Sequence, residues 1–244
     1  MSKEIYDADF YRTRHENKKD TAMEICRILK EIVPSINSAV DFGCAGGTFL
    51  HVLNNLGTEE ILGLDGPWVK EWLVISKDKF LEVNFEKPVK LSKKYDLAFS
   101  LEVAEHIPEK YAAQFIESIT EASDFILFSA AIPGQGGVMH VNEQWQSYWC
   151  NLFAQKNFVC LDYLRSIFWD NEKITYPMYK QNCLLYVKKE RVSEIKKLVF
   201  DFPLNVVHPE MFTYIVELEP RFRELPKIFL KKLKKRLLRI LREK

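Results

Sequence analysis

A glycine-rich turn, with an acid just ahead of it, is the segment of this sequence best equipped to hold a small ligand. The run from Ala39 to Thr48, Ala-Val-Asp-Phe-Gly-Cys-Ala-Gly-Gly-Thr, reads as a strand carrying Asp41, a turn, and the start of a helix. Glycine lets a ligand approach the backbone, and a helix N-terminus offers unpaired N–H groups. Six of the nine glycines lie in 43–47 and 134–137. We therefore expect both loops to lie against a ligand; two ordinary tight turns are the alternative.

The acids around the first loop indicate the kind of ligand. The dinucleotide fingerprint is G-x-G-x-x-G, whereas this loop reads G-x-x-G-G. Asp41 would repel a pyrophosphate, but it suits a ligand with an ammonium group. A second acid, Asp65, ends the next expected strand. From that position the acids of nucleoside-binding sheets hold paired ribose hydroxyls.

Two clusters of glutamate and histidine could carry acid–base chemistry. Glu102 and His106 stand four residues apart with Glu105 between them, and His140 follows the second glycine loop. A histidine suits a general base because its unperturbed pKa lies near neutrality. Carboxylates and imidazoles could also bind a divalent ion, with His140 facing the others. We favour loop fixing or acceptor positioning for Glu105 and His106, and we assign no metal.

The elements that must position these residues alternate between strand-like and helix-like segments. Amphipathic spacing predicts helices, and short apolar runs predict strands. Strands separated by helices indicate parallel pairing and a three-layer α/β sandwich. The last two strands are joined through 165–181 without a clear helix, which allows an antiparallel return. The expected strands are 38–42, 60–64, 80–84, 95–101, 124–132, 158–164 and 183–188, and the expected helices are 21–32, 48–55, 109–121 and 143–156.

Over roughly residues 20–190 the chain resembles the class I S-adenosylmethionine-dependent methyltransferases. Residues 40–47 match the family's first motif, and residues 95–108 match its fourth strand and the following loop. Ala45 replaces the usual second glycine, which costs little if its φ is negative, and Asn84 replaces the usual adenine-side acid. The resemblance implies a Rossmann-like fold with a seven-stranded, mostly parallel sheet and S-adenosylmethionine as cofactor. The implied cofactor-binding residues are Asp41, Gly43, Cys44, Ala45, Gly46, Gly47, Asp65, Gly66, Asn84, Phe85 and Ser100.

The acceptor is expected at the glutamate and histidine clusters. Residues 140–149 resemble methyltransferases encoded with bacterial surface-polysaccharide enzymes. His140 is the candidate general base, with acceptor hydrogen bonding or a helix-entry role as alternatives, and Glu102 and His106 complete the catalytic set. The expected substrate-binding residues are Glu105, Gln135, Asn142, Trp145 and Tyr148, although aromatic residues at this spacing are more often core.

The E-x-x-E-H run at 102–106 also resembles that of metal-assisted relatives, namely ubiquinone-pathway O-methyltransferases and enzymes that methylate small-RNA 3′ ends. In that alternative Glu102, Glu105, His106 and His140 are metal ligands.

Charge divides the chain into two unlike parts. The whole sequence has a formal net charge of +1, but residues 221–244 hold eleven Lys and Arg against two Glu. The remaining body is acidic, which argues against a nucleic-acid-binding body. Residues 226–244 form a predicted basic amphipathic helix. It could lie on anionic lipid, dock on its own domain, or bind nucleic acid.

These observations predict a cytoplasmic methyltransferase. The five cysteines lack CxxC spacing, which favours reduced thiols, and no secretory signal is visible. We expect an amino-terminal lid at 1–19, a methyltransferase domain at 20–190, an extension at 191–225, and the basic helix resting on the inner membrane. The expected function is O-methylation of a small glycan or phosphorylated capsule precursor. The alternatives are a metal-dependent RNA 2′-O-methyltransferase and a non-catalytic cofactor-binding subunit.

Overall fold

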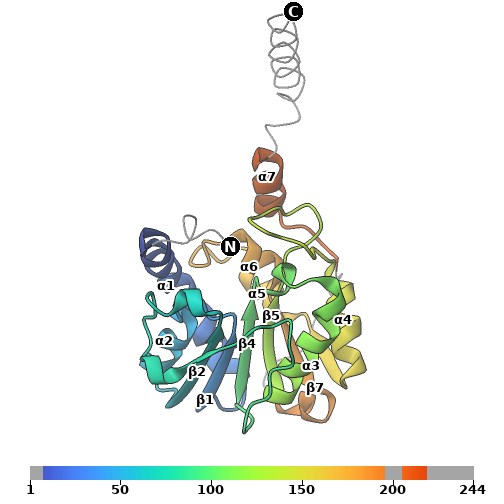
Figure 1. Ribbon diagram of the computed structural model, residues 1–244. Coiled ribbons are helices and arrows are strands. Elements are labelled where there is room, and N and C mark those ends of the chain that lie inside the picture. The colour runs from blue at the N-terminus through green and yellow to red at the C-terminus, as the bar shows by residue number, and fades with distance from the viewer. Residues whose placement is uncertain (1–7, 196–204, 219–244) are drawn as a thin grey trace, which may run out of the picture. The chain divides into compact units, whose positions relative to one another are not determined.

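The computed structural model describes residues 8–195 and 205–218 (Figure 1). Seven strands form one sheet in the order β3-β2-β1-β4-β5-β7-β6. All neighbours are parallel except β7, which runs antiparallel to both β5 and β6. The predicted fold class and the antiparallel return are therefore confirmed. The strands are β1 (Ser38–Phe42), β2 (Glu60–Asp65), β3 (Phe80–Glu82), β4 (Leu97–Leu101), β5 (Phe125–Ser129), β6 (Phe158–Leu161) and β7 (Leu184–Lys188).

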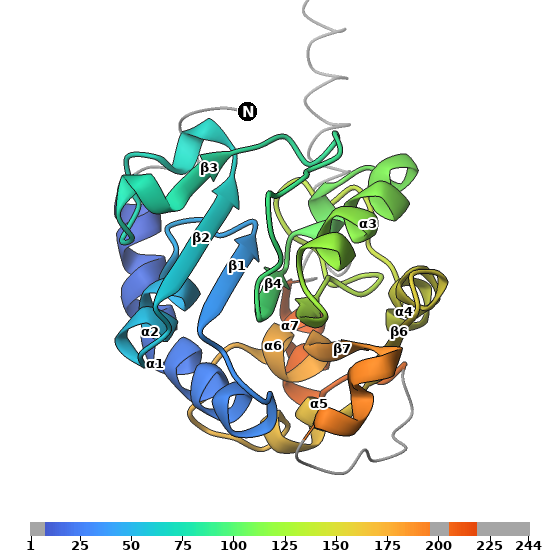
Figure 2. The ribbon, with the colours of Figure 1, turned by 90° about the horizontal axis from the view of Figure 1, so that it is seen from below.

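Helices cover both faces of the sheet, so the core has two halves. Alternate residues of each strand point to opposite faces, as Ala39 and Val40 do in β1. One half packs the sheet against α1 (Ala8–Ile32), α2 (Thr48–Asn55), α5 (Tyr163–Phe168) and α6 (Pro177–Asn182). The other packs it against α3 (Ala112–Ala122) and α4 (Gln146–Gln155). Figure 2 shows α1 and α2 on the opposite side of the sheet from α3 and α4.

Most element boundaries match the expected ones, and the differences have local causes. The apolar stripe predicted for the first helix is buried, but α1 begins earlier, at Ala8, inside the expected lid segment. The segment 165–181, expected to hold no clear helix, contains the end of α5 and most of α6, the latter beginning at Pro177, a residue suited to a first helical turn. The strand expected at 158–164 ends at Leu161, because α5 begins at Tyr163. The helix expected from residue 143 begins only at Gln146, because Glu143 is used by the preceding loop.

The strand order creates the place where a ligand can bind. β1 lies between β2 and β4, so the chain leaves β1 toward one side of the sheet and returns on the other. In such sheets ligands bind beyond the carboxyl ends of the strands at this switch point. The loops that follow β1, β4 and β5 all start at this edge, because these strands are parallel. They are the three loops that the sequence singles out.

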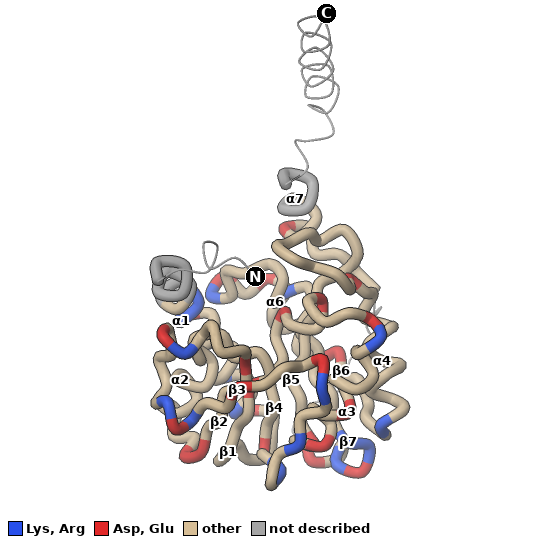
Figure 3. The backbone as a smooth tube through the Cα atoms, viewed as in Figure 1, with Lys and Arg blue, Asp and Glu red and all other residues tan. Residues whose placement is uncertain are grey.

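Residues 207–244 form a second unit, in which α7 (Pro209–Leu218) is the described helix. The predicted basic helix at 226–244 lies outside the described residues. No helix in the described part of the chain is long and apolar enough to cross a bilayer. In the first unit, acidic and basic residues are interspersed along the backbone (Figure 3).

Candidate active site

The first glycine-rich loop is a tight turn fixed to the end of β2. The amides of Gly43 and Cys44 donate to the carbonyl of Leu64, at 2.8 and 3.1 Å. Gly43 and Gly47 adopt positive φ, as the sequence predicts for such a turn. Ala45, however, also has a positive φ of 48°, so the condition under which this substitution would cost little is not met. A left-handed alanine costs about 1–2 kcal/mol, which the surrounding structure must offset.

Asp65 helps to stabilise the strained conformation of Ala45. Its carboxylate accepts the Ala45 amide at 2.8 Å and the Gly66 amide at 2.7 Å, so it ties the β1 loop to the end of β2. Burial raises the pKa of Asp65 to about 6, while these two amides act in the opposite direction. A carboxylate has about four lone-pair sites, so two remain for ligand hydroxyls. The position fits the predicted ribose contact.

Asp41 is almost completely enclosed, with 4% of its surface exposed. Burial raises its pKa to about 7, the charge of Asp65 adds to this, and Lys18 opposes it. Two acids near each other in a buried site favour a cationic ligand. The residues present therefore fit a cofactor that carries an ammonium group and a ribose, as S-adenosylmethionine does.

We expect the Kd for S-adenosylmethionine to fall as the pH rises from about 5.5 to about 8. Asp41 and Asp65 have pKa values of about 7 and about 6, so at lower pH both are protonated: Asp41 loses its attraction for the ammonium group, and Asp65 becomes a weaker acceptor for the ribose hydroxyls. If binding requires one of them to ionise, the affinity falls by up to about tenfold per pH unit below its pKa. Calorimetric titration across this range measures the effect. Asp41→Asn should flatten the profile, and a wild-type profile without slope would contradict the assignment.

The remaining predicted cofactor residues are placed less directly. Phe85 stacks on Phe42, with ring centroids 6.1 Å apart. Asn84 is exposed, and its Oδ1 accepts the amide of Glu86 at 2.9 Å. Ser100 is fully enclosed in β4 and its hydroxyl has no partner among the described residues, so a cofactor would reach it only if the chain moved. These assignments stay predictions.

Gly43 in the cofactor loop lies directly against Val103 in the acceptor loop, so replacing this glycine should lower the stability of the protein. Its φ is +93°, and an added Cβ would lie 2.3 Å from Cγ2 of Val103. We expect Gly43→Ala to lower the free energy of unfolding by about 2–4 kcal/mol, from backbone strain plus overpacking. Gly57→Ala is the matched control, because its φ is +88° but no atom lies within 4 Å of its added Cβ. Equal losses in urea denaturation would mean that Val103 causes no clash.

Glu102 ties together the segments around the expected acceptor position through hydrogen bonds to two side-chain amides. It follows β4 with a left-handed φ of 57°, a strained conformation for a non-glycine residue. Its carboxylate accepts Nε2 of Gln135 at 2.8 Å and Nδ2 of Asn182 at 3.1 Å. Burial raises the pKa of Glu102, and these amides oppose the rise. Because these amides fix the orientation of the carboxylate, Glu102 is better suited to positioning than to the predicted catalytic role.

The second glycine loop is folded around Glu143. This carboxylate accepts the amides of Gly134 and Gly136 at 2.8 Å each, and it lies 2.8 Å from Nδ1 of His140. An added Cβ on Gly137 would lie 2.2 Å from the His140 ring, so glycine leaves room for the imidazole. These glycines therefore serve the loop itself. The expectation that they lie against a ligand has no support here.

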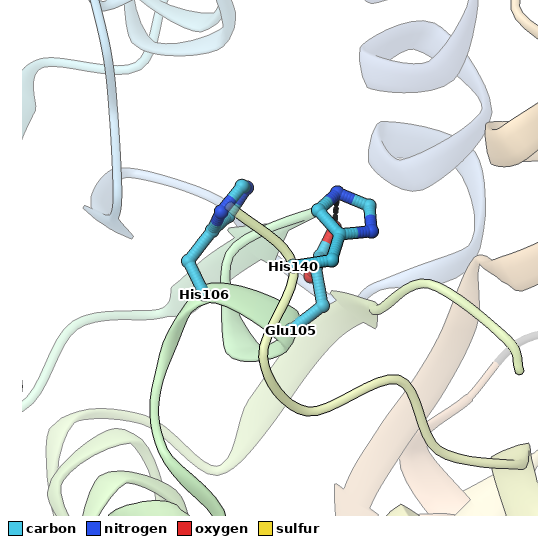
Figure 4. Close-up of side chains that lie close together, drawn as sticks. All are labelled: Glu105, His106 and His140. Carbon is cyan, nitrogen blue, oxygen red and sulfur yellow. Dashed lines mark ion pairs between the residues drawn. The ribbon is translucent and has the colours of Figure 1, made fainter. Parts of the chain in front are cut away.

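The side chains of Glu105, His106 and His140 lie close together (Figure 4). One ligand atom from each lies within 4.8 Å of those of the other two, so the three could hold a metal ion. Glu105 is 1% exposed, and its Oε1 lies 3.9 Å from Nε2 of His140. Burial, and then the charge of Glu102, raise the pKa of Glu105 well above its usual range. The structure thus brings together one predicted substrate residue and two predicted catalytic residues.

The other predicted acceptor residues differ in accessibility. Trp145 is 40% exposed and is available to a ligand. Tyr148 is half-buried and packs edge-on against Trp149, which lies in the core, as is common for aromatic residues at this spacing. Gln135 and Asn142 are both buried. The side-chain amide of Gln135 donates to Glu102 and accepts from Asn182.

Two residues that organise the site were missed from the sequence. Glu143 stands three residues after His140, and this spacing was the available signal. Asn182 had no such signal, because it reaches Glu102 from 80 positions away.

Comparisons with known proteins point to a methyltransferase domain. The model of a methyltransferase-domain family matches residues 14–171, more than half of the chain. No curated protein matches the sequence. An O-methyltransferase family protein from Burkholderia thailandensis has a similar structure, with a TM-score of 0.54 at 8% identity, covering 76% of this chain and 61% of that one. A protein from Nostoc punctiforme assigned as an O-methyltransferase gives 0.54 at 13% identity, covering 74% and 59%.

The two structural likenesses support the fold, and this chain spans only about 61% of the first protein's length. The family match rests on the sequence itself and includes the glycine-rich loop, Asp65, and the whole E-x-x-E-H and His140 region. The chain therefore belongs to this methyltransferase-domain family, whose members use S-adenosylmethionine as cofactor.

Proposed function

We propose that the chain transfers a methyl group from S-adenosylmethionine to a hydroxyl oxygen of a small glycan precursor. The observation that carries this proposal is that the loop after β1 packs against the loop after β4, where Gly43 lies next to Val103. Val103 fills the space beside Gly43 in the cofactor loop, and it sits between Glu102 and Glu105. The cofactor cradle and the glutamate and histidine cluster are therefore neighbours at one edge of the sheet.

The chain's own residues supply position and proton transfer. When bound, S-adenosylmethionine provides an electrophilic methyl group on a sulfonium sulfur. In-line displacement depends on how well the acceptor oxygen is positioned against that methyl group. A hydroxyl acceptor also needs to lose its proton, and His140 is the residue best arranged to receive it. Its Nδ1 bonds Glu143, which leaves Nε2 to accept the proton.

The assignment of a glycan acceptor rests on several lines of support. Residues 140–149 resemble methyltransferases encoded with surface-polysaccharide enzymes. Trp145, exposed near His140, offers a face on which a sugar ring can stack. The O-methyltransferase names of the two similar solved structures agree with oxygen as the acceptor atom.

One assay tests the proposed function. Purified protein is mixed with S-adenosylmethionine and with separate pools of nucleotide sugars, phosphosugars and small RNAs, and S-adenosylhomocysteine release is measured. We expect release with a sugar pool. Release with small RNA alone would overturn the proposal and favour an RNA 2′-O-methyltransferase. Cofactor binding without turnover on any pool would favour a non-catalytic subunit.

We further propose that the protein works in the cytoplasm at the inner membrane surface, held by residues 226–244. Their basic and leucine-rich composition suits anionic lipid. Val138, Met139 and Val141, each at least half exposed beside His140, would suit an acceptor presented near lipid.

Deleting 226–244 is therefore expected to abolish co-sedimentation with vesicles containing anionic lipid while sparing methyl transfer to a soluble acceptor. Zwitterionic vesicles are the control. Loss of folding in the truncated chain, seen by circular dichroism, would show instead that the segment docks on its own domain.

A further inference from the structure

Three side chains beside the acceptor position are arranged like a set of metal ligands. Glu105, His106 and His140 offer ligand atoms within 4.8 Å of one another. The two imidazole rings stand edge to face, with centroids 4.9 Å apart. The amides of Val141 and Asn142 donate to the carbonyl of Glu105, at 2.9 and 3.0 Å. The two segments that carry the three side chains are therefore fixed to each other, and Figure 4 shows them approaching from separate loops.

The outer hydrogen bonds of both imidazoles follow the pattern of metal-bound histidine. Nδ1 of His140 lies 2.8 Å from the Glu143 carboxylate, and Nδ1 of His106 lies 3.4 Å from the carbonyl of Met139. A proton on each Nδ1 leaves the lone pair on Nε2. Metal-bound histidines almost always donate the other ring N–H to a carboxylate or a carbonyl in this way.

The Glu105 carboxylate lacks the partner that its burial demands. It is 1% exposed, and the backbone amides of Glu105 and Ala131 lie near enough to oppose the rise in its pKa, but neither oxygen makes a hydrogen bond of standard geometry with the described residues. At 3.9 Å from Nε2 of His140, it is too far away for a hydrogen bond. Buried carboxylates are normally paired or bound to metal. A cation between these two atoms would satisfy both.

Glu102 provides an informative contrast within the same segment. Each of its oxygens accepts a side-chain amide, from Gln135 or Asn182, so its burial is compensated without a cation, and it lies outside the group of ligand atoms found within 4.8 Å of one another. The arrangement therefore points to one carboxylate and two imidazoles, with Glu143 as an outer partner. It does not support the four-ligand set considered from the sequence.

We propose that Glu105, His106 and His140 bind one divalent transition-metal ion, such as Zn²⁺, Mn²⁺ or Co²⁺. Two imidazoles and one carboxylate suit these ions and leave coordination positions open. Ligand atoms around a tetrahedral ion with bonds of about 2.1 Å lie about 3.4 Å apart. The most widely separated ligand atoms must therefore move closer by up to about 1.4 Å, which the exposed His106 side chain permits.

This inference rests on the proposed function and specifies how the acceptor is activated. With an ion bound, Nε2 of His140 is a ligand and no longer the base. The acceptor hydroxyl binds an open coordination position, where the ion lowers its pKa and its proton leaves to water. The sequence-based assignment of no metal at this site would then be wrong.

Cobalt titration of the full chain, first stripped with a chelator and free of cofactor and acceptor, tests the site. We expect one equivalent of Co²⁺ to bind with a visible absorption band. Glu105→Gln, His106→Ala and His140→Ala should each weaken binding at least about 100-fold. Glu143→Gln should weaken it about 10- to 100-fold, as outer-partner changes do.

His51→Ala is the control, because this histidine pairs with Asn55 in α2, away from the cluster. It should bind Co²⁺ like the wild type. Circular dichroism confirms that each variant is folded. Absence of saturable binding, or unchanged binding by the folded Glu105→Gln protein, would overturn the site.

The same protein separates this inference from the proposed function. Methyl transfer to a sugar pool that persists in EDTA, with no bound metal by elemental analysis, would overturn the role of the ion and leave the proposed function standing. Stoichiometric Co²⁺ binding, without methyl transfer to any pool, would support the site and overturn the proposed function.

Discussion

Replacing His140 with alanine is expected to lower the turnover of methyl transfer about 100-fold or more, with the Kd for S-adenosylmethionine unchanged. A general base contributes about 10²–10⁴-fold to a rate. The loss should be similar if the imidazole instead holds a metal ion, so this variant tests the importance of His140, and the cobalt titration tests its role. The cofactor loop makes no hydrogen bond with His140 in the described structure. Initial rates and calorimetry with the same preparation measure both quantities.

Two further variants, Glu143→Gln and His51→Ala, serve as comparisons for His140→Ala. Glu143 orients His140 and also holds the amides of Gly134 and Gly136, so its replacement should lower turnover, though less than loss of His140 itself. His51→Ala should behave like the wild type, because His51 bonds Asn55 on α2. Near-normal turnover of His140→Ala would place the proton acceptor elsewhere and remove the central residue of the proposed function.

The fold could be read from the sequence because its signals are local and repeated. Buried strands such as β5, whose five residues are all enclosed, stand out as short apolar runs. The helix after the glycine loop was predicted at its observed bounds because Gly47, in the left-handed region, marks its start. Boundaries failed where a side chain competes with the helix, as Glu143 does by bonding loop amides before α4 begins.

The candidate site could be predicted most directly where its residues lie at the carboxyl ends of neighbouring strands. Asp41, Asp65 and Glu102 were predicted in this way, and the structure places them at one edge of the sheet because parallel strands bring their carboxyl ends together. Asn182 was missed because it arrives from α6, and only the folded chain shows that its amide holds Glu102. The positive φ of Ala45 was also hidden, because it depends on a hydrogen bond to Asp65 on the next strand.

The two loops of the site are preorganised by partly buried carboxylates. Asp65 holds the amides of the cofactor loop, and Glu143 holds those of the second glycine loop. Each carboxylate thus fixes a glycine-containing turn, and each has lone pairs left for another partner. Loops held in this way keep their geometry before any ligand arrives, which reduces the ordering cost of binding.

Asp65→Ala is expected to weaken S-adenosylmethionine binding by about 1.5–3 kcal/mol, the range for hydrogen bonds to a charged group. This corresponds to a rise in Kd of about 10- to 150-fold. Two effects act in the same direction. The variant loses the acceptor for the ribose hydroxyls, and it releases the amides of Ala45 and Gly66, so the loop with its left-handed alanine relaxes. Calorimetric titration at pH 8, where the wild-type acid is ionised, gives the full difference.

Asp96→Ala is the control that separates ligand binding from loop stability. Like Asp65, Asp96 accepts two backbone amides, but it lies at the amino ends of the strands, away from the candidate site. Its carboxylate accepts the amides of Asn37 and Ser38, at 2.8 and 2.9 Å, just before and at the start of β1. Its loss should lower the free energy of unfolding without changing the Kd for the cofactor. If Asp65→Ala also left the Kd unchanged while lowering stability, Asp65 would be a loop anchor and not a ligand of the cofactor. A rise in Kd for Asp65→Ala alone would assign the binding effect to that carboxylate.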